Sequence, residues 1–283
     1  MLKSRLLLLA AAVLWSTAGA AIKLCGLSGW QIAAGRSLVA GIFLAVLVRE
    51  ARVLPTLRVV AVSVAYAFTV VLFVLATKLT TAANAIFIQD TAPVWVLLLS
   101  PWLLREAPTR GELAALPVYA VGLGLFFVDE LSAGQLTGNL LALASGVAFA
   151  LSIVGLRLLR HDGPSALVWG NVLAAALAFP FCVGGPAAAP RDVAIVVYLG
   201  IFQLGLSYLC FSRGIRGTPA VEASLLILLE PVLNPIWAFL LAGERPGPWA
   251  LVGGAVILAA TAWRTLAPVL ASRPCRSTRA SRS

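Results

Sequence analysis

Apolar segments about as long as a bilayer is thick recur along the whole chain, and they constrain its fold more than any other feature. A helix needs about 20 mainly apolar residues to cross roughly 30 Å of hydrocarbon. We place ten such segments, at 6–25, 30–48, 59–77, 82–104, 112–128, 138–157, 166–184, 193–212, 219–242 and 248–267. They are long and lack the alternation of barrel strands. The sequence therefore predicts an all-α membrane protein with ten transmembrane helices.

The composition excludes a water-soluble protein. Of the 283 residues, 61% are hydrophobic and 11% are charged, whereas a typical soluble domain has about 25% charged residues. The loops between the apolar segments are only a few residues long, so a scaffold or receptor that holds partners through its loops is not expected. Lys3 and Arg5 precede an apolar stretch as in a signal peptide. Because the apolar run continues to Cys25, we expect an uncleaved first helix.

Basic residues predict the orientation. Cytoplasmic loops of membrane proteins carry an excess of Lys and Arg. With the N-terminus inside, most of the 21 Lys and Arg fall on the cytoplasmic side, and the external loops keep Lys78, Arg191 and Arg245. We therefore expect a multi-pass protein of a bacterial-type inner (plasma) membrane, with both termini in the cytoplasm and a disordered basic tail at 269–283. Because the basic residues lie singly or in pairs at helix ends, nucleic acid is not an expected partner.

An internal repeat relates the two halves of the chain. The segment that starts at Asn84 aligns with the segment that starts at Glu222, at a constant offset of 138 residues. The aligned pairs are Lys78 with Arg216, Ala85 with Ala223, Pro93 with Pro231, Glu106 with Glu244 and Pro108 with Pro246. Since the repeated unit has an odd number of helices, five, the second copy enters the membrane from the opposite face. We predict two inverted repeats, residues 1–130 and 131–268, a construction that recurs in secondary transporters.

On these features the chain resembles the drug/metabolite transporter superfamily, in its ten-helix form with two EamA-type domains. The resemblance covers nearly the whole chain, and the repeated Pro and Glu of the fourth and ninth helices carry it. Other residues that support the resemblance are Trp15, Lys23, Arg36, and the glycines Gly122, Gly124, Gly253 and Gly254 of the fifth and tenth helices. Asp90 stands in an IQDTAP segment where some members have IQYTAP. The resemblance implies a transporter, and members export amino acids, nucleosides, drugs or other metabolites.

Four ionisable residues fall inside the predicted spans, where a charge is costly and is a functional candidate by default. Lys23 and Arg36 lie in the outer parts of the first two helices, and Asp90 and Glu230 lie deeper in the fourth and ninth. One interpretation is that these two cations and two anions pair and neutralise one another. The other is that a carboxylate binds substrate or protons, because each lies beside a proline that interrupts helical hydrogen bonding, Pro93 or Pro231. Arg36 suits a carboxylate or phosphate, and it could equally clamp Asp90.

Neutral polar and aromatic side chains in the spans are candidates for substrate contact. The candidates are Gln89, Trp95, Gln203 and Asn234, and Asn171, Ser207 and Tyr208 are further polar groups able to contact a substrate. Hydrogen bonding between helices is the alternative role for each of them. Together with the four charged residues and the two helix-kink prolines, they form the predicted site for substrate binding or coupling.

The sequence offers little for catalysis. The single histidine, His161, falls in a predicted cytoplasmic turn, the four cysteines lack metal-ligand spacing, and there is no phosphate-binding loop or cofactor motif. We predict a secondary transporter that exports a small metabolite or amino-acid-like compound by alternating access. A lipid or lipid-carrier flippase of the same fold and a membrane enzyme using Asp90 and Glu230 are the alternatives.

Overall fold

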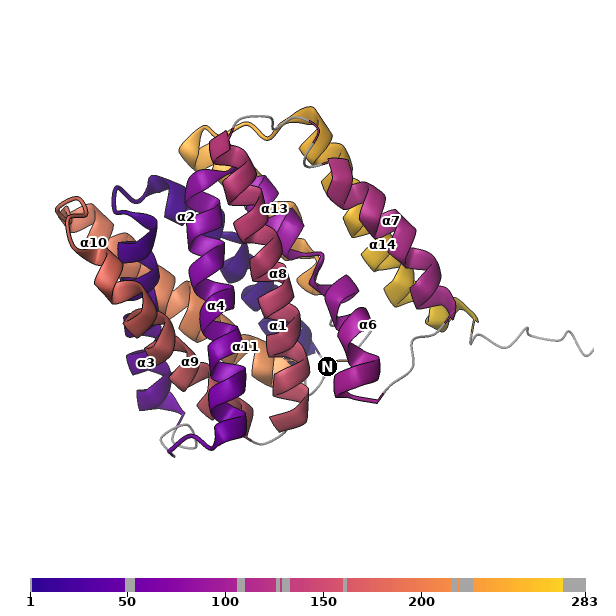
Figure 1. The fold of residues 1–283 in the computed structure, drawn as a ribbon, viewed down its shortest axis with the longest axis horizontal. Helices are drawn as coiled ribbons and strands as arrows, with labels where there is room; N and C mark the ends of the chain where they lie inside the picture. The colour runs from indigo at the N-terminus through magenta and orange to yellow at the C-terminus, as the bar shows by residue number, and fades with distance from the viewer. Residues whose placement is uncertain are drawn as a thin grey trace, which may run out of the picture.

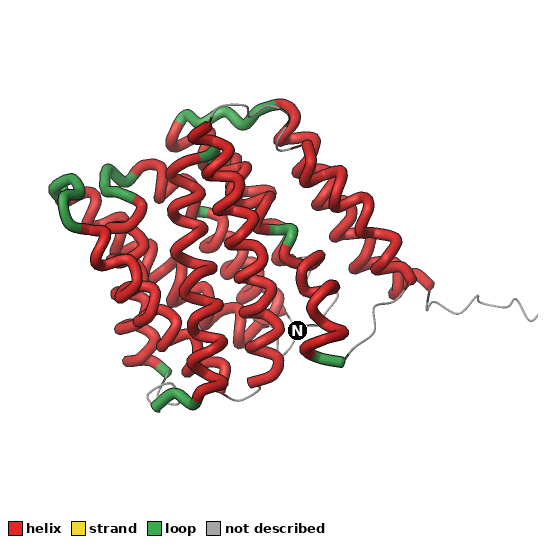
Figure 2. Tube along the Cα trace, viewed as in Figure 1, coloured by secondary structure: helices red, strands yellow, loops and turns green. Residues whose placement is uncertain are grey.

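The structure is a computed structural model that describes residues 2–48, 54–105, 110–125, 128, 133–159, 162–214, 218 and 226–271. Its regular elements are helices throughout this described part (Figures 1 and 2). The α-helices are α1 (Leu2–Ser16), α2 (Ala18–Leu24), α3 (Gly29–Leu47), α4 (Leu57–Leu79), α5 (Ala82–Gln89), α6 (Ala92–Leu103), α7 (Arg110–Leu125), α8 (Ala133–Leu159), α9 (Gly163–Ala178), α10 (Pro190–Tyr198), α11 (Ser207–Gly214), α13 (Leu229–Ala242) and α14 (Pro248–Ala271). A 3₁₀-helix, η3 (Phe179–Cys182), follows α9, and a π-helix, η4 (Leu199–Leu206), joins α10 to α11.

Helical segments long and apolar enough to cross a membrane account for most of the described chain. Seven qualify by length and composition: Leu2–Leu24, Gly29–Leu47, Leu57–Leu79, Ala82–Leu103, Gln135–Leu159, Gly163–Cys182 and Pro190–Gly214. Three shorter apolar helices, Leu116–Leu125, Leu229–Ala242 and Pro248–Trp263, coincide with the fifth, ninth and tenth predicted segments. The predicted all-α membrane class is confirmed, and the count of ten crossings stays a prediction.

Large apolar side chains on the outside of the bundle fit a lipid environment. On α3, Leu38, Ile42 and Val46 follow one another at one-turn spacing and are exposed, while Arg36 and Ala40 of the same helix are buried. Trp102 at the end of α6 is 85% exposed. A surface helix of a soluble protein has its polar face outside, so α3 has the reverse arrangement expected in lipid.

The bundle is built around α4, which packs against α8 and α9. Helix α3 packs against α9 and the π-helix, and α1 packs against α11 and α13. Helices α7 and α14 run side by side at one edge of the molecule (Figure 1). There the Tyr119 and Thr261 hydroxyls are hydrogen-bonded at 2.8 Å, and Gly122 lies so close to α14 that a Cβ atom would be 2.8 Å from Ile257.

Breaks in the helices occur at corresponding places in the two halves. The first half breaks at Asp90 and Thr91, between α5 and α6, and the second has a turn at Leu228, just before α13. Positions 90 and 228 differ by the 138 residues of the sequence repeat. Each break precedes its proline: Pro93 is in the first turn of α6 and Pro231 in that of α13, where a missing N–H is tolerated. The predicted kinks are therefore interruptions ahead of the prolines.

Candidate functional site

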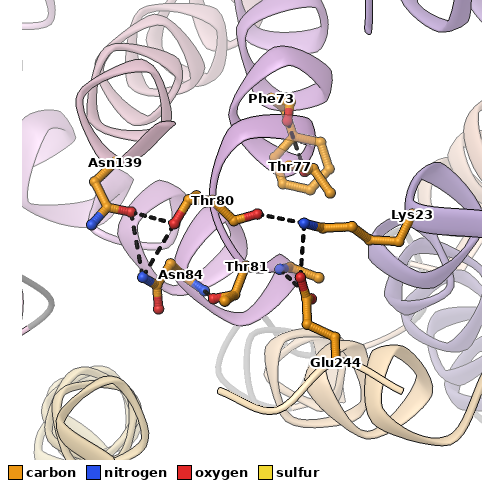
Figure 3. A network of polar contacts seen from close by, with 9 residues as sticks. Lys23, Phe73, Thr77, Thr80, Thr81, Asn84, Asn139 and Glu244 are labelled. Carbon is orange, nitrogen blue, oxygen red and sulfur yellow. Dashed lines mark hydrogen bonds and ion pairs between the residues drawn. The ribbon is translucent and has the colours of Figure 1, made fainter. Parts of the chain in front are cut away.

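A charged cluster lies at the end of the bundle at which α2, α4 and α13 finish (Figure 3). Lys23 Nζ forms an ion pair with Glu244 Oε1 at 2.7 Å and donates to the Thr80 carbonyl at 2.6 Å. The other carboxylate oxygen of Glu244 accepts from the Ala82 backbone N–H, at the start of α5, at 2.6 Å. Thr80 donates to Asn139 of α8 at 2.8 Å. These residues, the Lys23 cluster, connect helices from both halves.

Further contacts join loops at the same end. The carboxylate of Asp192 accepts from the Gly26 N–H at 2.7 Å, and Lys78 donates to the Cys25 carbonyl at 2.6 Å. Gln31 caps the start of α3 together with Ser28 and also reaches the Pro186 carbonyl at 3.0 Å. The loops before α3, α5, α10 and α14 are thereby held together. They are among the loops that the sequence assigns to the external side.

Arg36 lies in the interior of the bundle. It is 1% exposed and is the largest of the fully buried side chains. Its Nη2 atom donates to the Val70 carbonyl of α4 at 2.7 Å, and Nη1 donates to the Gln203 side chain of the π-helix at 3.4 Å. Its Nε atom has no hydrogen-bond partner. Within the described ranges Arg36 forms no ion pair, so the clamp on Asp90 is not the arrangement observed.

Tyr66, which is buried, and Tyr208, which is partly buried, lie near Arg36. The rings of Tyr66 and Tyr208 are 5.9 Å apart, and Trp15 meets Tyr208 edge-to-face at 5.3 Å. Asn171 donates to the Tyr66 hydroxyl at 3.4 Å. Tyr208 is close enough to interact electrostatically with both Arg36 and Glu230. It therefore connects the buried cation to the acidic part of the site.

Asp90 and Glu230, from opposite halves of the chain, lie within electrostatic range of each other where α5 packs against α13. Asp90 ends α5 at the first break, and Glu230 lies in the first turn of α13 after the second break. The two carboxylates are near enough for their charges to repel each other. The buried Oδ2 atom of Asp90 has no hydrogen-bond partner, and neither acid is ion-paired to a described residue. The proposed neutralisation by Lys23 is wrong, because Lys23 pairs with Glu244.

Comparison with known proteins agrees with this architecture. The sequence profile of the EamA-like transporter family matches residues 2–128 and 136–265. The chain belongs to the EamA-like transporter family. The resemblance to the drug/metabolite transporters is thereby confirmed, and the enzyme alternative is rejected because the family consists of transporters.

Individual relatives of this EamA-like transporter are distant. It is 25% identical over 218 residues to an "Uncharacterized transporter" of Archaeoglobus fulgidus, with 73% of each chain covered. It is 27% identical to a "Probable terminal-alkyne amino-acid exporter" of Streptantibioticus cattleyicolor, covering 63% of this chain and 62% of the relative. It is 21% identical to the Escherichia coli "Biotin transporter", covering 65% and 64%. A crystal structure with 20% identity shares the fold, with a TM-score of 0.66 over 95% of this chain and 99% of the other.

The other predicted site residues of the EamA-like transporter are dispersed. Gln89 donates to Ser145 of α8 at 2.6 Å, and the Trp95 indole lies 3.3 Å from the Thr91 hydroxyl. The Gln89 contact is a hydrogen bond between helices, and the Trp95 contact is local to its own segment. Asn234 is fully buried against Gly19 of α2, and its amide atoms have no hydrogen-bond partner. Of the predicted set, the structure brings together Arg36 with Gln203, and Asp90 with Glu230.

Some functional features were missed or lie outside the description. Glu244 was recognised only as an anchor of the repeat, and that repeat was the available signal for it. Tyr66 was not selected, because one tyrosine in an apolar segment gives no signal of its own. The residues Glu106, Pro108, His161, Arg216, Glu222, Ala223 and the tail from residue 272 lie outside the described residues.

Proposed function

We propose that the chain is a secondary transporter that moves a small metabolite or amino-acid-like compound by alternating access. The observation that carries this proposal is the electrostatic proximity of Asp90 and Glu230, one from each half, at two breaks that are 138 residues apart. Interrupted helices from two halves are where transporters of inverted-repeat construction expose polar groups to a substrate. Arg36 and its aromatic neighbours extend this site.

The packing of the helices supports two equivalent halves, residues 1–130 and 131–268. The offset of the repeat matches α1 and α2 with α8, α3 with α9, α4 with α10 and α11, α6 with α13, and α7 with α14. When each helix is exchanged for its match, observed neighbours become observed neighbours: α4 with α9 becomes η4 with α3, and α6 with α8 becomes α13 with α2. The pairs α3 with α9 and α7 with α14 exchange with themselves. Ten crossings in two inverted repeats account for this pattern.

The Lys23 cluster fits a gate of such a transporter. It joins Lys23 and Ala82 of the first half to Glu244 of the second through one carboxylate. The basic residues predict that this end is external, with both termini in the cytoplasm of a bacterial-type inner membrane. In that orientation the Lys23 cluster would hold the outer end closed. Similarity to a named amino-acid exporter supports export of an amino-acid-like compound.

Glu230, assisted by Asp90, is the proposed coupling group. Two neighbouring carboxylates in a low-dielectric interior cannot both keep their charges without a cation or a proton. A residue that takes up a proton on one side and releases it on the other couples transport to a proton gradient. Loading and release then follow from the exposure of the site to the two sides in turn.

Reconstitution into proteoliposomes tests the proposal. Vesicles containing the purified protein are given a defined metabolite mixture, and uptake, efflux and exchange are measured by mass spectrometry against protein-free vesicles. We expect saturable movement of at least one small metabolite. Transfer of labelled phospholipid between leaflets, without movement of any metabolite, would instead identify a lipid flippase. If neither metabolites nor lipid move, the proposed function is wrong.

A further inference from the structure

We infer that the transported compound carries a carboxylate and that Arg36 is the residue that binds it. This inference rests on the proposed transport function and adds the chemical class of the substrate. It is carried by three observations around Arg36: a buried charge without a counter-ion, a free hydrogen-bond donor, and a polar and aromatic lining that leads toward the two acids.

The charge of Arg36 is not balanced by its protein contacts. Its described partners are the Val70 carbonyl and the Gln203 amide oxygen, which are both neutral. The contact with Gln203 is long, at 3.4 Å, and Nε has no partner. A guanidinium is permanently charged, and burying it without a counter-ion is strongly unfavourable. An anion bound during transport would supply the missing charge and accept the free N–H.

A carboxylate fits this place better than a phosphate. The planar guanidinium presents parallel N–H groups that match the two oxygens of a carboxylate. A phosphate carries up to about two charges and is held where several cations converge. Two lysines, Lys23 and Lys78, already have partners in the Lys23 end of the bundle. Lys23 binds Glu244 and the Thr80 carbonyl, and Lys78 binds the Cys25 carbonyl. A single guanidinium thus favours a singly charged group.

The chain is shaped locally to hold Gln203 against Arg36. Gln203 lies in the π-helix, a rare conformation that is frequent at functional sites. At Gly200 a Cβ atom would be 2.9 Å from the Arg36 carbonyl, and Gly205 lies directly against Phe43. These two glycines let the π-helix approach α3 closely. Gln203 is consequently a positioning residue that orients the guanidinium.

The acidic and aromatic neighbours define how a ligand would lie. Arg36 and Tyr66 are fully buried, while Tyr208, Trp15 and Glu230 are only partly buried. Tyr208 interacts electrostatically with both Arg36 and Glu230. A compound whose carboxylate reaches Arg36 therefore passes the aromatic rings and has its other end near the acids.

The first test is the chemistry of the transported compounds. We expect every compound moved in the proteoliposome screen to carry a carboxylate, and the corresponding carboxamide to be neither transported nor inhibitory. The variant Arg36→Lys, which keeps the charge but loses the planar fork, should raise the half-saturating concentration about tenfold or more while the protein stays folded. If amides are moved as well as acids, or if Arg36→Lys transports with unchanged kinetics, the inference falls and the transport function stands. If no compound is transported at all, the proposed transport function itself is wrong.

A second test needs no transport and has a matched control. Gln203→Glu places a carboxylate beside Arg36, so the variant should unfold at a higher temperature than the native protein in detergent, and it should no longer bind carboxylates. Asn234→Asp makes the same amide-to-acid change at a buried position whose amide has no described partner, and it should lower the unfolding temperature. Equal destabilisation by both variants would show that the positive charge of Arg36 is not stabilised by a neighbouring carboxylate, and it would overturn the inference.

Discussion

Removing the charge of Glu244 should open the Lys23 end of the protein. Lys23 and Glu244 are 20% and 16% exposed, so their ion pair is better shielded than a surface pair. In Glu244→Gln the amide can still accept from the Ala82 N–H, but the charge-assisted bond to Lys23 is lost. A charged hydrogen bond contributes about 1.5–3 kcal/mol, and surface pairs up to about 1 kcal/mol. Taking about 1.5 kcal/mol for this pair, the ratio of open to closed molecules rises about tenfold.

Cys25 provides the assay. Its side chain is 2% exposed, and it lies two residues after Lys23 at the closed end. In a protein with the other cysteines, Cys182, Cys210 and Cys275, replaced by serine, a membrane-impermeant maleimide reports how often this end opens. We expect the labelling rate of Cys25 to rise about tenfold in Glu244→Gln.

The neighbouring Arg245→Gln is the control, because it changes one exposed charge in the same loop. It should leave the labelling rate of Cys25 near that of the native protein. An unchanged rate in Glu244→Gln would refute the reasoning that the Lys23 cluster holds this end closed. An equal increase in both variants would attribute the effect to loop charge rather than to the ion pair.

Two further predictions concern packing and topology. Gly122→Ala should lower the unfolding temperature in detergent, because the added methyl group overpacks α7 against α14 at a cost of about 1–3 kcal/mol. Gly124→Ala on the same helix meets no atom within 4 Å and should be neutral or slightly stabilising. The opposite order of unfolding temperatures would contradict the observed α7–α14 contact. Topology reporters fused after Arg58 or Arg160 should give a cytoplasmic signal, and a reporter fused within 129–138 should give an external signal. Cytoplasmic signals from all of these positions would contradict the inverted ten-helix topology.

The sequence predicted the helices well because the property that forms them is local. Each span is a continuous apolar run, and its ends are marked by nearby glycine, proline and charge. The repeat also marked Pro93 and Pro231 in advance. It did not show that the helices break just before these prolines, because the choice between a kink and an interruption depends on which neighbours satisfy the freed carbonyls.

The partners of the charged residues could not be read from the sequence. Lys23 meets Glu244 across 221 residues of chain, and Arg36 meets Gln203 across 167. Charge matching alone favoured Lys23 and Arg36 as partners of Asp90 and Glu230. The packing of α2 beside α13 brings Lys23 to Glu244 instead and leaves the two deeper acids unpaired among the described residues. The π-helix that carries Gln203 also escaped prediction, since Gly200 and Gly205 resemble ordinary glycines of a membrane helix.

The most direct test of the transport account is pH-driven accumulation by the variant Glu230→Gln. Glutamine keeps the shape and hydrogen-bonding capacity of the side chain but cannot carry a proton. In proteoliposomes with an imposed pH gradient, the native protein should accumulate its substrate, and Glu230→Gln should not. Exchange of labelled for unlabelled substrate, which requires no net proton movement, should survive in the variant. Accumulation at the native rate by Glu230→Gln would contradict the coupling role of the Asp90–Glu230 pair.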